Sequence, residues 1–155
     1  MKLATVTAWL DLLVAPGVSL DEATRAVGPL IRRDRPRSEA HLRSSEPGVV
    51  EAVAELDESA ELRLIGLALT LDPPQSLDAP QLVARFGEPF DLGPRMDQFG
   101  PREPRYCFRF VHQETAMQLI IELARQDGPT FMVSEIIGRV NDLAGIELAE
   151  EPPEP

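Results

Sequence analysis

The sequence has few of the residues on which disulfide bonding and metal binding usually depend. It contains one cysteine, Cys107, among 155 residues, so no intrachain disulfide can form, as is usual in a reducing compartment. A metal site needs three or four converging ligands. The two histidines, His41 and His112, and the single cysteine show no ligand spacing. We therefore expect neither a bound metal nor a cofactor.

Recognisable catalytic motifs are also missing. His112 and Cys107 are five residues apart on one expected strand, and an odd separation places two side chains on opposite faces. A nucleophile needs a base within hydrogen-bond reach, so this pair does not predict catalysis. Gly93 and Gly100 are each followed by proline, which removes the amide donors that a phosphate-binding loop requires. The sequence predicts that the protein is not an enzyme.

Long hydrophobic runs are absent as well. No stretch approaches the roughly 18 apolar residues of a membrane span. The apolar run near the N-terminus is interrupted by Asp11 and is not followed by a small-residue cleavage site, so we expect a helix over residues 5–15 rather than a signal peptide. These features predict a cytoplasmic protein with no membrane partner.

Lysine is almost absent, and the net charge is −11, which disfavours binding to nucleic acid. The arginines gather in two segments, around residues 32–43 and 95–109. Such clusters either form ion pairs with nearby acidic residues or bind an acidic partner. The second segment also holds Met96 and Phe99 outside any apolar period, as expected of interface anchors. The candidate partner-binding residues are Arg32, Arg33, Arg35, Arg37, Arg95, Met96, Phe99, Arg102 and Arg105.

Periodicity predicts an α+β fold. Ser19 is a good N-cap, and Gly28-Pro29 ends the helix that follows it. The segments Val49–Leu56 and Leu62–Leu71 alternate as a hairpin, with Leu62 and Leu64 on the face opposite Arg63, Ile65 and Leu67. The remaining expected elements are a short edge strand at Ala40–Arg43, a helix capped by Ser76, and strands at Tyr106–Val111, Met117–Leu123 and Phe131–Val140.

The chain also shows a faint internal repeat. Residues 19–71 and 76–140 each contain a helix, an arginine-rich loop and strands, with Asp72-Pro73-Pro74 as the seam between them. We expect one domain over residues 1–146, built from two related helix–β-meander halves. Six strands form one antiparallel sheet with the helices on one face. Residues 147–155 are acidic and proline-rich and are expected to be disordered.

The order Ser-Leu-Asp, apolar helix, Phe-Gly-Glu-Pro, loop and three-stranded meander over residues 76–140 carries a family resemblance. It resembles the group that contains β-lactamase inhibitor protein and the small lipoproteins of the outer-membrane barrel-assembly machinery. The resemblance implies a protein-binding module that uses its exposed sheet face and loops. The disulfides and lipid-attachment cysteine of those relatives have no counterpart here, so no binding residue is carried over.

These observations favour a non-enzymatic bacterial protein-binding module, either an immunity or inhibitor protein or a secretion adaptor. The acidic residues Glu51, Glu55, Glu58 and Glu61 would serve the immunity role, and the arginine loops the adaptor role. The alternative is a regulatory domain that binds a small anion between the two halves, and an enzyme built from carboxylates is the third class. Strand edges at Ala40–Arg43 or Phe131–Val140 would allow a homodimer.

Overall fold

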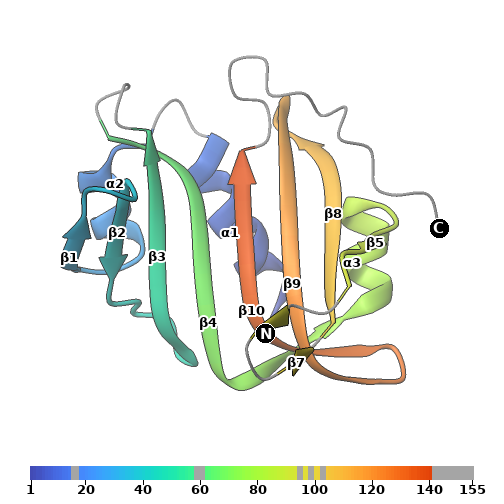
Figure 1. Ribbon diagram of the computed structural model, residues 1–155. Coiled ribbons are helices and arrows are strands. Elements are labelled where there is room, and N and C mark those ends of the chain that lie inside the picture. Colours follow the sequence, from blue (N-terminus) through green and yellow to red (C-terminus); the bar gives the residue numbers. More distant parts are fainter. Residues whose placement is uncertain (15–17, 58–61, 94–95, 98–99, 102–103, 141–155) are drawn as a thin grey trace.

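A computed structural model describes residues 1–14, 18–57, 62–93, 96–97, 100–101 and 104–140 (Figure 1). The expected tail at 147–155 lies outside the described residues. The helices are α1 (Leu3–Val14), α2 (Leu20–Ala26) and α3 (Ala79–Phe86). The strands are β1 (Leu30–Asp34), β2 (Glu39–Leu42), β3 (Val49–Asp57), β4 (Arg63–Asp78), β5 (Phe90–Asp91), β6 (Met96–Asp97), β7 (Gly100–Pro101), β8 (Arg105–His112), β9 (Thr115–Asp127) and β10 (Thr130–Val140).

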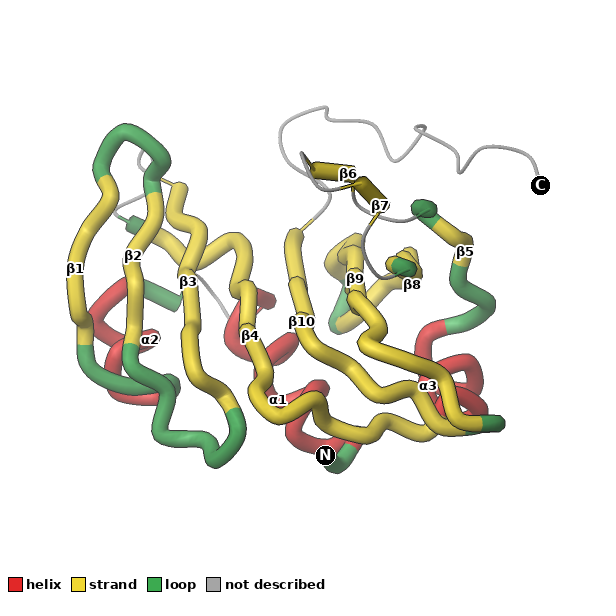
Figure 2. The backbone as a smooth tube through the Cα atoms, turned by 60° about the horizontal axis from the view of Figure 1, so that its bottom comes forward, coloured by secondary structure: helices red, strands yellow, loops and turns green. Residues whose placement is uncertain are grey.

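The fold is α+β, as predicted, and its centre is one antiparallel sheet of eight strands in the order β1-β2-β3-β4-β10-β9-β8-β5. The β6–β7 pair forms a separate small sheet. Figure 2 shows the three helices on the same side of the large sheet, from α2 near β1–β3, through α1 at the centre, to α3 near β8. None of the described helices therefore covers the opposite face of the sheet.

The core lies between the helices and the sheet. Alternating residues of the central strands are buried there, including Ala52 and Ala54 of β3 and Leu119 and Ile121 of β9. Leu10 and Leu13 of α1 approach the sheet at Gly138, where an added Cβ would lie 3.0 Å from Leu10 and 3.3 Å from Leu13. Glycine at this position lets the central helix pack closely against β10.

Strand β4 differs from the prediction in two ways. Glu55 pairs with Gly66 while Leu56 pairs with Leu64, so Ile65 is an extra residue in a bulge. The bulge reverses the alternation, and Leu64 becomes fully buried in the core. The strand also continues through the two prolines that were predicted to be a seam, because its ladder with β10 is interrupted between Thr70 and Gln75. Prolines, which donate no hydrogen bond, are tolerated in such a gap.

The number of strands and the identity of the edge strands also differ from the prediction. Eight strands rather than six form the sheet, and the strand predicted at Ala40–Arg43 is β2, an inner strand. The edge is β1, which was not predicted. Phe131–Val140 is not an edge either, because β10 pairs with both β4 and β9. The third helix is capped by Asp78, whose side chain accepts from the Gln81 amide at 3.0 Å, and not by Ser76.

Candidate protein-binding surface

The predicted arginine residues 32–37 lie on the β1–β2 hairpin at one end of the sheet. Strand β1 pairs with β2 on one side and with no described strand on the other. Its outer backbone N–H and C=O groups are therefore available to another strand. The opposite end of the sheet is different, since β5 has two residues and the Arg109 guanidinium lies 5.1 Å from the Phe90 ring centre.

Two large apolar side chains are displayed on this free edge. Leu30 is 43% exposed and Ile31 is 57% exposed. Leu30 pairs with Leu42 and Arg32 pairs with His41, so Ile31 between them is an extra residue in a β-bulge of the edge strand. Natural edge strands are usually protected by charged residues, and here the protecting charges, Arg32 and Arg33, follow directly.

The position of the hairpin is fixed by the turn that precedes it. Gly28 has a φ of +155°, and a Cβ at this residue would lie 1.6 Å from the Arg43 carbonyl oxygen. The neighbouring backbone is held by hydrogen bonds from the Arg43 amide to Pro29 at 2.9 Å and from the Ser45 amide to Val27 at 3.0 Å. Only glycine fits this close approach, so the helix end predicted from Gly28-Pro29 also places β1.

The four arginines of the hairpin have different environments. Arg33 donates to the Glu39 carbonyl oxygen at 3.1 Å and is half-buried. Arg37 is 77% exposed, and its Nε lies 3.9 Å from an Asp34 oxygen, which makes a weak ion pair. Arg32 and Arg35 are exposed and form no hydrogen bond or ion pair with any residue in the described part of the chain. Three of the four guanidinium groups are thus presented to solvent.

The second predicted arginine segment is only partly described. Arg95, Phe99 and Arg102 lie outside the described residues, and for Met96 only the backbone, in β6, is described. Arg105 is the first residue of β8, and its Nε donates to the Gly93 carbonyl at 3.4 Å. Strands β3, β4, β10 and β9 separate Arg105 from the β1–β2 hairpin, so the structure does not bring Arg105 together with the first set.

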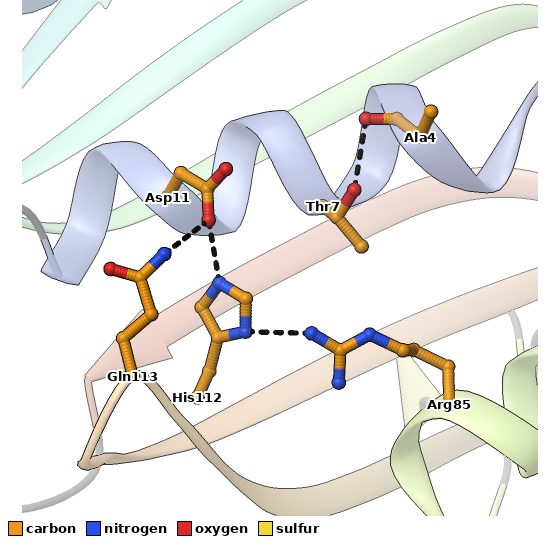
Figure 3. A network of polar contacts seen from close by, with 6 residues as sticks. All are labelled: Ala4, Thr7, Asp11, Arg85, His112 and Gln113. Carbon is orange, nitrogen blue, oxygen red and sulfur yellow. Dashed lines mark hydrogen bonds and ion pairs between the residues drawn. The ribbon is translucent and has the colours of Figure 1, made fainter.

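His112 forms a polar network that the sequence did not reveal (Figure 3). Its Nδ1 is 3.0 Å from the Arg85 guanidinium and its Nε2 is 2.7 Å from Asp11 Oδ1, which also accepts from Gln113 at 2.9 Å. Because a guanidinium only donates, Nδ1 accepts and Nε2 donates to the carboxylate. Both ring nitrogens are used, and no described hydroxyl or thiol contacts them. The network joins α1, β8 and α3 and has no nucleophile.

The environment of Cys107 is that of an unreactive thiol. The residue is buried, and its Sγ lies 3.9 Å from the Phe108 carbonyl oxygen. Burial raises the pKa of the thiol, and the nearby Arg109 guanidinium offsets this only in part. A buried thiol with a raised pKa holds little of the reactive thiolate at neutral pH. The register of β8 also places Cys107 and His112 on opposite faces, as their separation predicts.

A surface groove lies between α1, the last residue of α2 and the loop that joins β2 to β3. It has a volume of about 440 Å³ and is lined by Trp9, Leu12, Ala26 and Glu46, among others. Its lining includes a carboxylate and no cationic side chain, so this groove does not fit a small anion. A different group, Asp34, Glu39 and His41, is the one set of potential metal ligands that converges within the described residues, and its members lie on strands β1 and β2.

None of the described helices is both long and apolar enough to cross a bilayer. No protein-family model, curated protein or solved structure matches this chain. The resemblance to the β-lactamase inhibitor group therefore stays a prediction.

Proposed function

We propose that this chain is a non-enzymatic protein-binding module that pairs the free edge of β1 with an extended acidic segment of another protein. The observation that carries this proposal is the combination of an unpaired edge strand, two exposed apolar side chains and solvent-facing arginines. In strand addition, the backbone hydrogen bonds supply affinity and the alternate side chains supply specificity. Leu30 and Ile31 would contact the partner's apolar residues, and the arginines its carboxylates.

Charge favours a different protein over a second copy of this chain. An antiparallel pair of β1 strands centred on Arg32 would place the two Arg32 side chains directly opposite each other. Like charges at directly opposed positions destabilise a strand pair. An acidic strand meets the opposite condition at the same positions. The homodimer that the sequence allowed is therefore the weaker alternative.

The same surface supports the secretion-adaptor role over the immunity role. An immunity function would use the acidic side chains of the β3 region. Of these, Glu55 is engaged by Arg139 at 2.8 Å, and Glu51 lies 3.5 Å from His41, while Glu58 and Glu61 are outside the described residues. The guanidinium groups of Arg32 and Arg35 have no such partners within the described residues and remain available.

We also propose that the sheet is an internal duplication of residues 19–71 and 76–140. The strand order supports this, because β1-β2-β3-β4 and β5-β8-β9-β10 run inward from the two ends and meet at the antiparallel β4–β10 pair. A helix precedes each set of strands and ends at a glycine with positive φ, Gly28 or Gly87. A crystal structure in which the two halves fail to superpose strand for strand would contradict the duplication.

The binding proposal is tested by capture of partners with matched charge variants. The bait with Arg32→Glu and Arg35→Glu is compared with wild type and with a control carrying Lys2→Glu and Arg125→Glu, which makes the same change in net charge at exposed positions away from β1. Bound proteins are quantified by mass spectrometry after nuclease treatment. We expect a stoichiometric partner that the control retains and the β1 variant loses.

A partner that the β1 variant retains would overturn the proposed surface. Equal loss with both variants would mean that only overall charge matters, and would also overturn it. Where a partner is captured, Ile31→Asp gives a second test, since it adds a negative charge to the edge and leaves the arginines unchanged. If no bait captures a partner, a thermal-shift screen with phosphorylated metabolites tests the anion-binding alternative.

A further inference from the structure

We propose that Asp34, Glu39 and His41 form a binding site for a divalent transition-metal ion such as Zn²⁺. One carboxylate oxygen from each acid and one ring nitrogen of His41 lie within 4.8 Å of one another. Asp34 is on β1, and Glu39 and His41 are on β2, so the ligands come from both strands of the hairpin. The side chains are half-buried rather than dispersed in solvent.

The strand register concentrates negative charge at this point. Asp34 pairs with Glu39 across β1 and β2, and Glu39 pairs with Glu55 across β2 and β3. Three carboxylates therefore occupy directly opposed positions on consecutive strands, an arrangement that costs stability unless a cation compensates it. Glu55 is compensated by Arg139 at 2.8 Å, whereas Asp34 has only the exposed Arg37 at 3.9 Å.

Glu39 is the least compensated member of the group. Its backbone carbonyl accepts from Arg33, but its carboxylate forms no hydrogen bond or ion pair with a residue that the structure describes. Of the cations in this region, Arg33 is engaged with that carbonyl, Arg37 lies near Asp34 and Arg139 near Glu55. Arg32, which pairs with His41 in the register, is exposed. The guanidinium of Arg32 can remain in solvent while a metal ion occupies the space between the carboxylates.

The imidazole of His41 determines which metal ions the site would prefer. Its side chain is 15% exposed, and its Nδ1 lies 3.5 Å from Glu51 Oε1 on β3. A metal-bound histidine usually donates its other ring N–H to a carboxylate, which fixes the ring and makes the ligand nitrogen more basic. Glu51 is placed for that role, with Nε2 as the metal ligand. One imidazole with two carboxylates suits Zn²⁺ and its neighbours, whereas Ca²⁺ and Mg²⁺ prefer oxygen ligands alone.

The required adjustment is small. Ligand bonds to Zn²⁺ are about 2.0–2.2 Å long, so tetrahedral ligands lie about 3.4 Å apart. The ligand atoms, which lie within 4.8 Å of one another, would therefore have to approach by up to about 1.4 Å when the ion binds. Three protein ligands leave a fourth position open to water or to a group from a partner. The bound ion would link the edge strand to β2 directly and, through Glu51, to β3.

The test measures metal binding by the full-length, tag-free chain, and it does not depend on finding a protein partner. Zn²⁺ is titrated by calorimetry, and Co²⁺ is used as a visible-absorption probe of coordination. The two histidines provide a matched pair. We expect one Zn²⁺ per chain, at least about tenfold weaker binding by His41→Asn, and unchanged binding by His112→Asn. Glu51→Gln should weaken binding by about 10–100-fold, as expected for a residue that orients a ligand.

The proposal is overturned if wild type binds no stoichiometric Zn²⁺, if His41→Asn binds as well as wild type, or if His112→Asn loses binding to the same extent. Should His41→Asn fail to fold, the imidazole NMR signals of the wild-type protein test whether Zn²⁺ binds at His41. The signals of His41 must move on addition of Zn²⁺ while those of His112 stay in place. Movement of the His112 signals alone would place the ion elsewhere.

Discussion

The two ends of the sheet use the same chemical groups in different ways. At the β8 end, His112 is 6% exposed, and its two nitrogens are held by Asp11 and Arg85. At the β1 end, His41 faces several carboxylates, and its one ion-pair contact with a described residue is a 3.5 Å approach to Glu51. The first histidine has no capacity left for a ligand. The second has a ring nitrogen that a cation can use.

The difference follows from the number of elements packed around each residue. His112 lies on the helix-covered face, where α1 and α3 each contribute a side chain (Figure 3). His41 lies on β2 beside the edge strand, between the buried core residues Ala40 and Leu42, and no described helix supplies a partner for it. A polar group within the core must be satisfied by the fold itself. A polar group near an open edge can be satisfied by a ligand or a partner.

We call the β1 end of the sheet the open end and the β8 end the closed end. The largest effect on stability is expected at the turn before β1, which fixes the position of the open end. Gly28→Ala places a Cβ against the Arg43 carbonyl and forces a residue with positive φ to carry a side chain, so we expect a loss of about 3 kcal/mol or more in the free energy of unfolding. Gly128→Ala is the control, because its φ is also positive, +61°, but nothing lies within 4 Å. It should cost about 1 kcal/mol. Urea unfolding measures both, and equal losses would contradict the role of the Arg43 contact.

The next prediction compares the two histidines directly. His112→Ala removes a buried ring and leaves Asp11 and Arg85 without their shared partner, so it should cost about 2–3 kcal/mol. His41→Ala, measured in a metal chelator, should cost about 1 kcal/mol or less, because few contacts are lost at the edge. Chemical unfolding at neutral pH checks both values. A larger loss at His41 than at His112 would reverse the distinction between the closed and the open end.

Sequence patterns predicted the inner strands better than the edge. Strands β3 and β9 alternate because one face of each is buried, and that alternation is visible in the sequence. Strand β1 reads Leu-Ile-Arg-Arg-Asp, without alternation, because neither of its faces is fully buried. Pro73 and Pro74 of β4 were predicted to interrupt the chain between two halves, and this prediction was wrong because it could not include the pairing partner of the strand. The gap in the ladder that accommodates them depends on a neighbouring strand more than 50 residues away.

The candidate sites were also predicted only where the signal is local in the sequence. Arginines 32–37 were identified from their clustering along the chain, but their place on a free edge required the sheet order. Asp11 and His112 are 101 residues apart, and the one local signal was a carboxylate that interrupted an apolar run. The group around His41 was missed because its ligands converge only when a hairpin turn pairs Asp34 with Glu39. Spacing along the chain gave no indication of either arrangement.

A smaller effect should come from the second partner of His112. Arg85→Ala removes the contact to Nδ1 and a guanidinium that lies 5.3 Å from the Phe86 ring centre, so we expect a loss of about 0.5–1 kcal/mol. Arg25→Ala is a matched control, since both arginines lie in the last turn of a helix and share the same interaction with its dipole. Thermal or urea unfolding should show less change for Arg25. Similar losses would mean that the His112 contact adds nothing measurable.

The smallest expected effect concerns the pH dependence contributed by Cys107 at the closed end. Burial raises the pKa of its thiol, so above the ordinary cysteine pKa of about 8.5 the unfolded chain loses this proton before the folded chain does. The folded state then binds more protons than the unfolded state, and the free energy of unfolding contributed by this group falls as the pH rises. Below about pH 8 the contribution should be constant.

This prediction is checked by urea unfolding of wild type and Cys107→Ala at about pH 7.5 and about pH 9.5, on either side of the ordinary thiol pKa. Other groups titrate equally in both proteins, so the difference between the two slopes isolates the thiol. Wild type should lose more stability than the variant over this interval. An Ile31→Cys, Cys107→Ala protein extends the comparison to the open end, because a thiol at that exposed position should react rapidly with an alkylating reagent while native Cys107 is protected. Equal slopes together with equal alkylation rates would mean that the two ends do not differ in accessibility.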